Sequence, residues 1–193
     1  MKRKIVMICL MVLIKSCASV SEKTVVRMKG HDEAPEWASL SKSTYVKSDR
    51  LYSVGFTEVN ANARISAAFR ISDNNARFEI SREVTDDMAF IFQNLEEGLD
   101  DSGTLARFYG TEVSKLIVQN IRQEKRYWEK VQSFDDSGER VYKLRLYSLV
   151  SIRKSDLKKA IKTTLDQGKG ITPSIKNQID LHITKEIQKI GEL

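Results

Sequence analysis

The feature that most limits the fold of this chain is a pair of strand patterns joined by a compact turn. Residues 140–152 alternate between two sets of side chains, as in a β-strand with one face on a core. Residues 125–134 contain Tyr, Trp, Val and Phe, which favour strands, and Asp-Asp-Ser-Gly at 135–138 is a turn signal. The sequence therefore predicts an antiparallel hairpin. Its second strand is expected to have an inner face with Tyr142, Leu144 and Leu146 and an outer face with Lys143 and Arg145.

Residues 60–84 carry the strongest helical pattern of the chain. Side chains three and four residues apart form one face for packing: Ile65, Phe69, Ser72, Ala76, Ile80 and Val84. Ala68, Ser72 and Ala76 also form a ridge of small residues, which lets a helix lie close against a sheet. The strand predicted just before it, residues 50–59, contains Gly55, which indicates a bulge or a close backbone approach.

Further helical segments are predicted at 86–94, 104–122, 155–165 and 174–190, the last one opened by Pro173. The predicted order is strand, long helix pair, hairpin, helix, helix. This order predicts an α+β fold: an antiparallel sheet of three or more strands with helices packed on one face. We assign the α+β domain to residues 34–165 and a C-terminal helix to residues 166–193.

The chain begins with a basic and apolar segment that ends in a cysteine. Residues 2–4 are basic, residues 5–14 are ten apolar residues, and Cys17 follows. Ten helical residues span about half of a ~30 Å hydrocarbon core, which fits a secretory signal better than a membrane-spanning helix. The order Leu-Ile-Lys-Ser-Cys at 13–17 resembles a bacterial lipobox, in which the cysteine is acylated and becomes the new N-terminus.

On this interpretation, residues 1–16 are a signal peptide, and residues 17–33 are the lipidated Cys17 and a tether that reaches about 50 Å when extended. Acyl chains on Cys17 would hold the domain to a bacterial membrane. Ala18 is not the acidic residue of known inner-membrane retention signals, so we expect the outer membrane, with the domain facing the periplasm or the cell surface. Two alternatives stay open: a cleaved signal with a free thiol, and an uncleaved anchor or interfacial helix.

The net charge gives no support for binding to nucleic acid. The formal charge of +6 includes four basic residues in the signal, and the remainder has 28 basic and 26 acidic residues. Such a balanced chain lacks the electrostatic footprint of a nucleic-acid-binding protein. Cys9 lies inside the signal, so the mature domain would have no disulfide.

The sequence contains no recognisable catalytic or metal-binding constellation. Its two histidines, His31 and His182, lie far apart, which argues against a nucleophilic triad and against a zinc site. The acidic residues between 96 and 101 lack the alternating spacing of a calcium loop. No phosphate loop or dinucleotide fingerprint occurs. We therefore expect no enzyme activity, no metal and no cofactor.

Two features are candidates for contact with a partner. Trp37 is expected to pack on the edge of the domain, with an aromatic ligand platform as the alternative. The last helix carries an isoleucine stripe: Ile175, Ile179, Ile183, Ile187 and Ile190. This stripe either packs on the domain or serves a coiled-coil or partner contact, so its central residues Ile179, Ile183 and Ile187 are interaction candidates.

Three short motifs carry a family resemblance: Pro-Glu-Trp at 35–37, Tyr-Ser-Val-Gly at 52–55, and an Ala-rich helix with Ala-Arg at 76–77. Together they resemble the small bacterial outer-membrane lipoproteins of the twenty-kilodalton surface-antigen type. That family is related to a flagellar basal-disc lipoprotein and to the N-terminal domain of a flagellar assembly protein. The resemblance covers roughly residues 35–156. It implies a fold more than an activity, and it implies no catalytic residues.

The resemblance and the signal together imply a membrane-anchored envelope lipoprotein that acts as a structural or assembly module, in a flagellum-associated setting or elsewhere in the envelope. Its partner would be another copy of itself or another envelope protein. The alternative is a monomeric, periplasm-facing lipoprotein that binds a lipid or another small apolar ligand. The first function predicts an exposed strand edge or isoleucine stripe, and the second predicts an apolar cavity.

Overall fold

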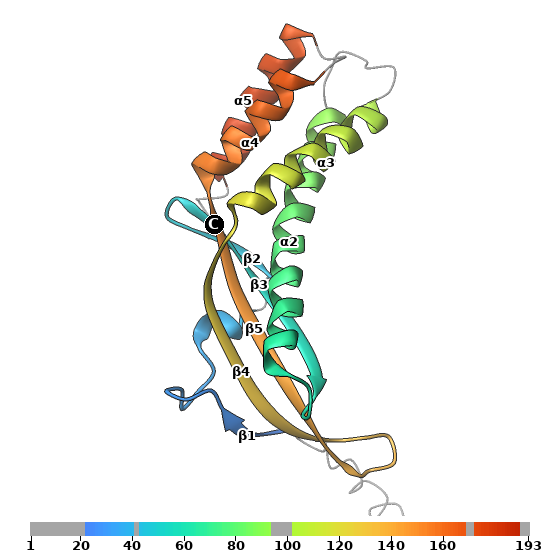
Figure 1. The fold of residues 1–193 in the computed structure, drawn as a ribbon. Helices are drawn as coiled ribbons and strands as arrows, with labels where there is room; N and C mark the ends of the chain where they lie inside the picture. Colours follow the sequence, from blue (N-terminus) through green and yellow to red (C-terminus); the bar gives the residue numbers. More distant parts are fainter. Residues whose placement is uncertain (1–21, 41–42, 94–101, 169–171, 190–193) are drawn as a thin grey trace, which may run out of the picture.

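The computed structural model describes residues 22–40, 43–93, 102–168 and 172–189, which form an α+β fold around one antiparallel sheet (Figure 1). The sheet has five strands in the order β1-β4-β5-β3-β2. The strands are β1 (Lys23–Arg27), β2 (Thr44–Lys47), β3 (Arg50–Asn60), β4 (Arg122–Phe134) and β5 (Arg140–Arg153). The helices are η2 (Glu36–Ala38, a 3₁₀ turn), α2 (Ile65–Gln93), α3 (Ser102–Asn120), α4 (Lys154–Gln167) and α5 (Pro173–Lys189). The predicted fold class is confirmed.

The predicted hairpin forms the centre of the sheet. β4 and β5 pair along nearly their whole lengths, with Tyr127 opposite Tyr147. The turn between them is held by Asp135, whose carboxylate accepts the backbone N–H groups of Ser137 at 3.0 Å and Glu139 at 2.9 Å. This local hydrogen bonding fixes the turn and, through it, the register of the two strands.

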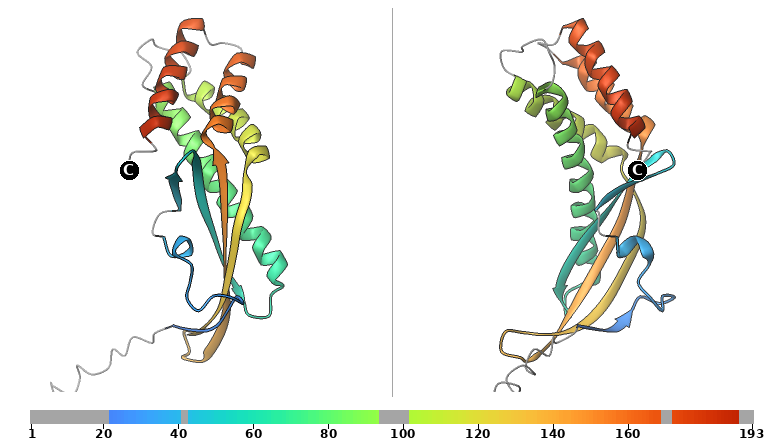
Figure 2. Two further views of the ribbon diagram at one scale, coloured as in Figure 1. Left: turned by 90° about the vertical axis from the view of Figure 1, so that its left-hand side faces the viewer. Right: turned by 180° about the vertical axis from the view of Figure 1, so that it is seen from behind.

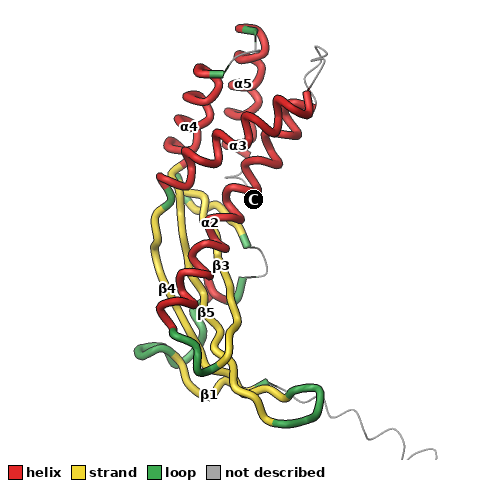
Figure 3. The backbone as a smooth tube through the Cα atoms, turned by 45° about the vertical axis from the view of Figure 1, so that its right-hand side comes forward, coloured by secondary structure: helices red, strands yellow, loops and turns green. Residues whose placement is uncertain are grey.

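The helices cover one face of the sheet and form a bundle beyond its end (Figures 1 and 2). The first half of α2 lies along β3 and β5, and its second half packs against α3. The two helical patterns predicted at 60–84 and 86–94 join in one continuous helix, which begins at Ile65, because residues 60–64 form the end of β3 and a turn. α4 follows β5 directly and, with α3 and α5, completes the bundle at the end of the sheet away from β1 (Figure 3).

At Gly55 in β3, the backbone of the sheet lies very close to α2. A Cβ atom at this position would lie 1.9 Å from the carbonyl oxygen of Ser72 and 2.5 Å from the backbone nitrogen of Ala76. Ser72 Oγ lies 2.7 Å from Ser148 Oγ of β5, and both side chains are fully buried. The ridge of small residues thus brings α2 against the sheet as predicted. The register of β3 with β5 is regular, so Gly55 marks a close approach rather than a bulge.

Buried apolar side chains form two clusters along α2. The smaller cluster fills the space between the start of α2 and the sheet and contains Ala68, Phe69, Leu144 and Leu146. The larger cluster joins the second half of α2 to α3, α4, α5 and the nearby ends of β3 and β5. Its fully buried members include Ile80, Met88, Phe92, Tyr109, Val113, Ile117, Ile152 and Ile179. Leu144 and Leu146 therefore face the core as predicted.

The prediction that Tyr142 also faces the core is wrong, because its side chain is 40% exposed. The hairpin extends beyond the start of α2, so its tip projects past the helix (Figure 1). There the ammonium group of Lys130 lies 5.0 Å from the centre of the Tyr142 ring, in a cation–π contact. Lys143 and Arg145 lie on the opposite face of the sheet from Leu144 and carry outward charge, as predicted.

The beginning of the described chain also differs from the prediction. Residues 17–33 are predicted to be a tether, but residues 23–27 form β1, with Arg27 opposite Glu129 of β4. This edge strand has five residues and an irregularity between Thr24 and Val26, so its alternation is too short and too broken for a sequence pattern to detect. Any tether before β1 is correspondingly shorter than predicted.

The opposite edge of the sheet is only partly covered. β2 pairs with residues 50–53 of β3, and Val54 N–H donates to the carbonyl oxygen of Ser43 at 2.8 Å. Next along this edge, the side-chain amide of Asn75 in α2 donates to the carbonyl oxygen of Phe56 at 2.9 Å. Within the described part of the chain, no strand pairs with the remainder of this edge of β3.

We expect Gly55→Ala to lower the free energy of unfolding by about 3 kcal/mol or more, because the new methyl group would meet backbone atoms of α2. Gly138→Ala is the matched control. Nothing lies within 4 Å of a Cβ atom there, so its positive φ of 81° alone adds a cost, about 1–2 kcal/mol. Denaturant unfolding measures both values, and equal losses would contradict the close approach of α2.

Candidate binding groove on the outer sheet face

The sheet face opposite α2, here called the outer face, is crossed by the N-terminal segment, residues 23–40 (Figures 1 and 2). Glu129 of β4 is buried beneath this segment and fixes it. Its carboxylate accepts the hydroxyl groups of Tyr127 at 3.1 Å and Thr24 at 3.5 Å, and Arg27 Nε lies 3.8 Å away. Burial and the adjacent Glu129 carboxylate raise the pKa of Tyr127 to about 12, so its phenol remains a donor.

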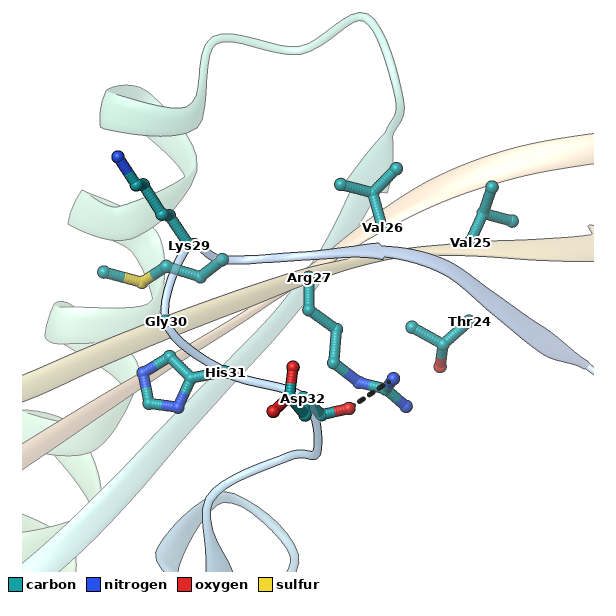
Figure 4. Close-up of a pocket in the computed structure, with 9 residues that line it drawn as sticks. Thr24, Val25, Val26, Arg27, Lys29, Gly30, His31 and Asp32 are labelled. Carbon is teal, nitrogen blue, oxygen red and sulfur yellow. Dashed lines mark hydrogen bonds between the residues drawn. The ribbon is translucent and has the colours of Figure 1, made fainter.

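The turn after β1 encloses a hollow of about 300 Å³ lined by residues 24–32 (Figure 4). Arg27 points into the turn, where its Nη1 donates to the carbonyl oxygen of Asp32 at 2.8 Å. Val25 and Val26 lie on the other side of the backbone and are exposed. A single segment supplies all of the lining, and Arg27 is hydrogen-bonded within that segment. We therefore attribute this hollow to the path of the loop and do not treat it as a binding site.

A larger hollow lies on the outer face where η2, β2, β3, β4 and β5 come together, and we call it the Trp37 groove. Its volume is about 620 Å³, which is in the range of ligand-binding sites. The groove is partly open to solvent. Its apolar lining consists of Trp37, Leu40, Tyr45, Tyr52 and Leu149.

The aromatic side chains of the groove are held by short local structures. Pro35 begins the η2 turn, and its carbonyl oxygen accepts the N–H of Ala38 at 2.8 Å, which fixes the backbone around Trp37. Tyr45 and Tyr52 are opposite each other in the β2–β3 pair, and their rings stack with centres 5.2 Å apart and planes 9° apart. Burial, with the charges of Tyr52 and Glu36, raises the pKa of Tyr45, so its side chain presents a neutral phenol.

The charged lining of the groove divides into one engaged group and three free groups. Glu124 accepts the hydroxyl group of Ser151 at 2.6 Å and pairs with Arg50 at 3.3 Å. In the part of the chain that the structure describes, the charged groups of the other three lining residues make no hydrogen bond or ion pair. These three residues are Glu36, Lys47 and Lys125. The groove thus offers aromatic surface together with unpaired charge, two positive groups and one negative.

Beyond the groove, the outer face carries an ion-pair network. Glu58 of β3 accepts Lys143 Nζ at 2.7 Å and Arg145 Nε at 2.8 Å, and Arg145 also pairs with Glu22 at 2.5 Å. Burial by itself raises the pKa of Glu58, but the two hydrogen-bonded cations outweigh it and hold the pKa below its ordinary value of 4.5. The basic side chains that the sequence predicts on the outside are therefore already paired.

The structure brings only one of the predicted interaction residues to a possible binding surface. Trp37 is half-buried and lines the groove. Ile179 is fully buried in the larger core cluster, so at this position the stripe packs on the domain. The side chains of Ile183 and Ile187 lie outside the described residues, as do Cys17 and the acidic residues between 96 and 101.

Sequence reasoning missed Tyr45, Lys47 and Lys125. β2 is a strand of four residues, and only its pairing with β3 places Tyr45 against Tyr52. Lys125 reaches the groove beside an irregularity between Gln123 and Lys125 in β4, which no periodic pattern indicates. The sequence of β3 does contain a signal for Tyr52. Successive side chains of a strand point to opposite faces, so Tyr52 points to the outer face when its neighbour Ser53 is buried on the inner face.

A further hollow of about 860 Å³ lies between α2 and α3 on the helical side of the molecule. Phe78, which is 63% exposed, and Val118 contribute apolar surface to it. Its remaining lining consists largely of short hydroxyl side chains and charged groups that pair within their own helices, such as Arg82 with Glu79 and Lys115 with Glu112. This hollow therefore lacks the convergent unpaired groups of the Trp37 groove.

The chain matches no protein-family model, no curated protein and no solved structure. In the ranges that the structure describes, no helix has both the length and the apolar content needed to cross a membrane. The same ranges contain no group of three or more His, Cys, Asp or Glu residues that could hold a metal ion. The choice of the Trp37 groove as the candidate functional site therefore rests on the geometry and charges of the groove alone.

We expect Ile179→Ala to destabilise the protein by about 2–5 kcal/mol, because this side chain is 0% exposed in the core. Leu181→Ala, two residues further along α5, removes a side chain that is 60% exposed and should cost less than about 0.5 kcal/mol. Thermal or denaturant unfolding compares the two variants. Similar small losses would show that the stripe is a partner surface instead of core.

The depressed pKa of Glu58 predicts a pH-dependent contribution to stability. The contribution is present above the unfolded pKa of about 4.5 and is lost as pH falls through the lower folded pKa. Glu58→Gln should therefore cost up to about 1 kcal/mol at pH 7, the scale of a partly exposed ion pair, and less at pH 3. Urea unfolding at both pH values measures this, with Glu83→Gln as the control. An equal cost at both pH values would contradict the assignment.

Proposed function

We propose that this protein is a membrane-anchored envelope lipoprotein that acts as a structural or assembly module and binds its partner through the Trp37 groove. Acyl chains on Cys17 would anchor it to the outer membrane, with the domain facing the periplasm or the cell surface. The observation that carries the proposal is the groove itself, where a half-buried tryptophan, a stacked tyrosine pair and three unpaired charges converge. An enzymatic role has no comparable support from the described residues.

The position of β1 gives this proposal a geometric consequence. With Cys17 as the anchor, only residues 18–22 precede the sheet, and these extend to about 20 Å at most. The β1 end of the sheet would be held near the bilayer, while the helical bundle lies at the other end (Figure 3). The groove lies on the same sheet face as the anchored segment, so a partner in the adjacent envelope layer could reach it. The flagellar relatives in the family resemblance make flagellar structures the first setting in which to look.

Metabolic labelling with a fatty-acid probe tests the anchor. We expect the native chain to be labelled and to fractionate with the outer membrane, and Cys17→Ser to lose the label, because the sulfur atom is the acylation site. Cys9→Ser is the matched control, since Cys9 lies in the apolar run before the cleavage site and should leave labelling intact.

Two results would contradict the lipoprotein proposal. One is label that persists in Cys17→Ser. The other is mass spectrometry of the mature protein that finds an unmodified thiol at Cys17 or a different first residue.

A further inference from the structure

We propose that the ligand of the Trp37 groove is an acidic glycan chain. Its sugar rings would lie on Trp37 and on the Tyr45–Tyr52 pair, and its carboxylates would pair with Lys47 and Lys125. The inference rests on the proposed function, because it names the partner chemistry for that same site.

The aromatic surface suits the faces of sugar rings. A pyranose ring presents C–H groups on its faces and hydroxyl groups at its edges, so it packs against an aromatic face while its edges stay hydrogen-bonded. The groove has the matching arrangement, with rigid aromatic faces and polar groups around them. The rings of Tyr45 and Tyr52 are nearly parallel in their stack, with planes 9° apart, and the η2 turn fixes the backbone around Trp37. Little side-chain entropy would be lost when a ring packs on such surfaces.

The charges of the groove favour a ligand with negative groups. Lys47 and Lys125 are unpaired in the described structure, while Glu124 is already engaged by Arg50 and Ser151. Glu36 is the single free carboxylate, and it can accept hydroxyl groups of a sugar. The two free ammonium groups outnumber it, so the groove attracts an anion and can form charge-assisted hydrogen bonds with ligand carboxylates.

Two other ligand classes fit the groove less well. A lipid acyl chain would cover charged groups without pairing them, which costs free energy. An extended peptide usually binds by adding a strand to a sheet edge, whereas this groove lies on a sheet face. There the backbone groups of Tyr45 and Tyr52 already belong to the β2–β3 ladder. A glycan chain needs neither an enclosed cavity nor free backbone groups, and an open groove accommodates its length.

Titration calorimetry on the full-length protein in detergent tests the inference. The acidic probe is a β-1,4-linked tetrasaccharide of alternating N-acetylglucosamine and N-acetylmuramic acid, and the neutral probe is the tetrasaccharide of N-acetylglucosamine. We expect the acidic probe to bind about tenfold more tightly, since two carboxylates meet Lys47 and Lys125. Trp37→Ala should weaken both probes by about tenfold or more. Lys125→Gln should weaken the acidic probe by a factor of about three to ten and leave the neutral probe unchanged.

Control variants separate a binding effect from a folding effect. Trp37→Phe keeps an aromatic face and should restore most of the affinity lost in Trp37→Ala. Phe78→Ala removes an exposed ring between α2 and α3, and Lys158→Gln removes an exposed charge on α4, so both should bind like the native chain. Thermal unfolding of each variant verifies that the domain is intact.

Several outcomes would overturn the inference. Equal affinity for the two tetrasaccharides would exclude a role for the carboxylates, and equal affinity for a tetraglutamate peptide would exclude a role for the sugar. Unchanged binding by a folded Trp37→Ala variant would exclude the groove. The labelling of Cys17 is a separate readout. A lipidated chain that binds no glycan would contradict the proposed ligand and leave the proposed lipid anchor standing. An unlipidated chain that binds glycan rejects the anchor and retains the ligand.

Discussion

The contact between α2 and the sheet at Gly55 is the constraint on which the rest of this structure depends. Without a side chain at that position, the backbone of β3 meets the backbone of α2 at Ser72 and Ala76. The helix therefore occupies the inner face of the sheet closely enough for Ser72 to reach Ser148 in β5. Because α2 continues beyond the sheet as one rod, the same contact also sets where α3, α4 and α5 assemble.

With the inner face filled, the outer face is left to the N-terminal segment, and its attachment shapes the groove. The buried Glu129 accepts the hydroxyl group of Tyr127 and lies beside Arg27, which secures β1. From β1 the chain turns back across the sheet and places Trp37 beside Tyr45 and Tyr52. The candidate site thus depends on a charged contact beneath β1 as well as on its own aromatic residues.

The sequence pattern was enough to predict those parts of the fold that interactions between neighbouring residues determine. The turn at Asp135 and the long helix each follow from residues near one another in the sequence. At Gly55 the sequence left a bulge and a close approach open, and only the contact with Ser72 and Ala76 of α2 decides between them. β1 and the groove could not be predicted in this way, because they form when segments about a hundred residues apart meet. β1 pairs with β4, and η2 contacts β5. The isoleucine stripe is an intermediate case, since periodicity predicts an apolar face at Ile179 but not which surface buries it.

The side chain of Asn75 has a consequence for how this molecule meets copies of itself. β3 continues past β2 with bare backbone, which is the kind of edge that invites another sheet to join. By donating to the carbonyl oxygen of Phe56, Asn75 occupies an acceptor that an incoming strand would need. This hydrogen bond from a helix therefore makes it harder for a strand of a second molecule to pair with this edge of β3.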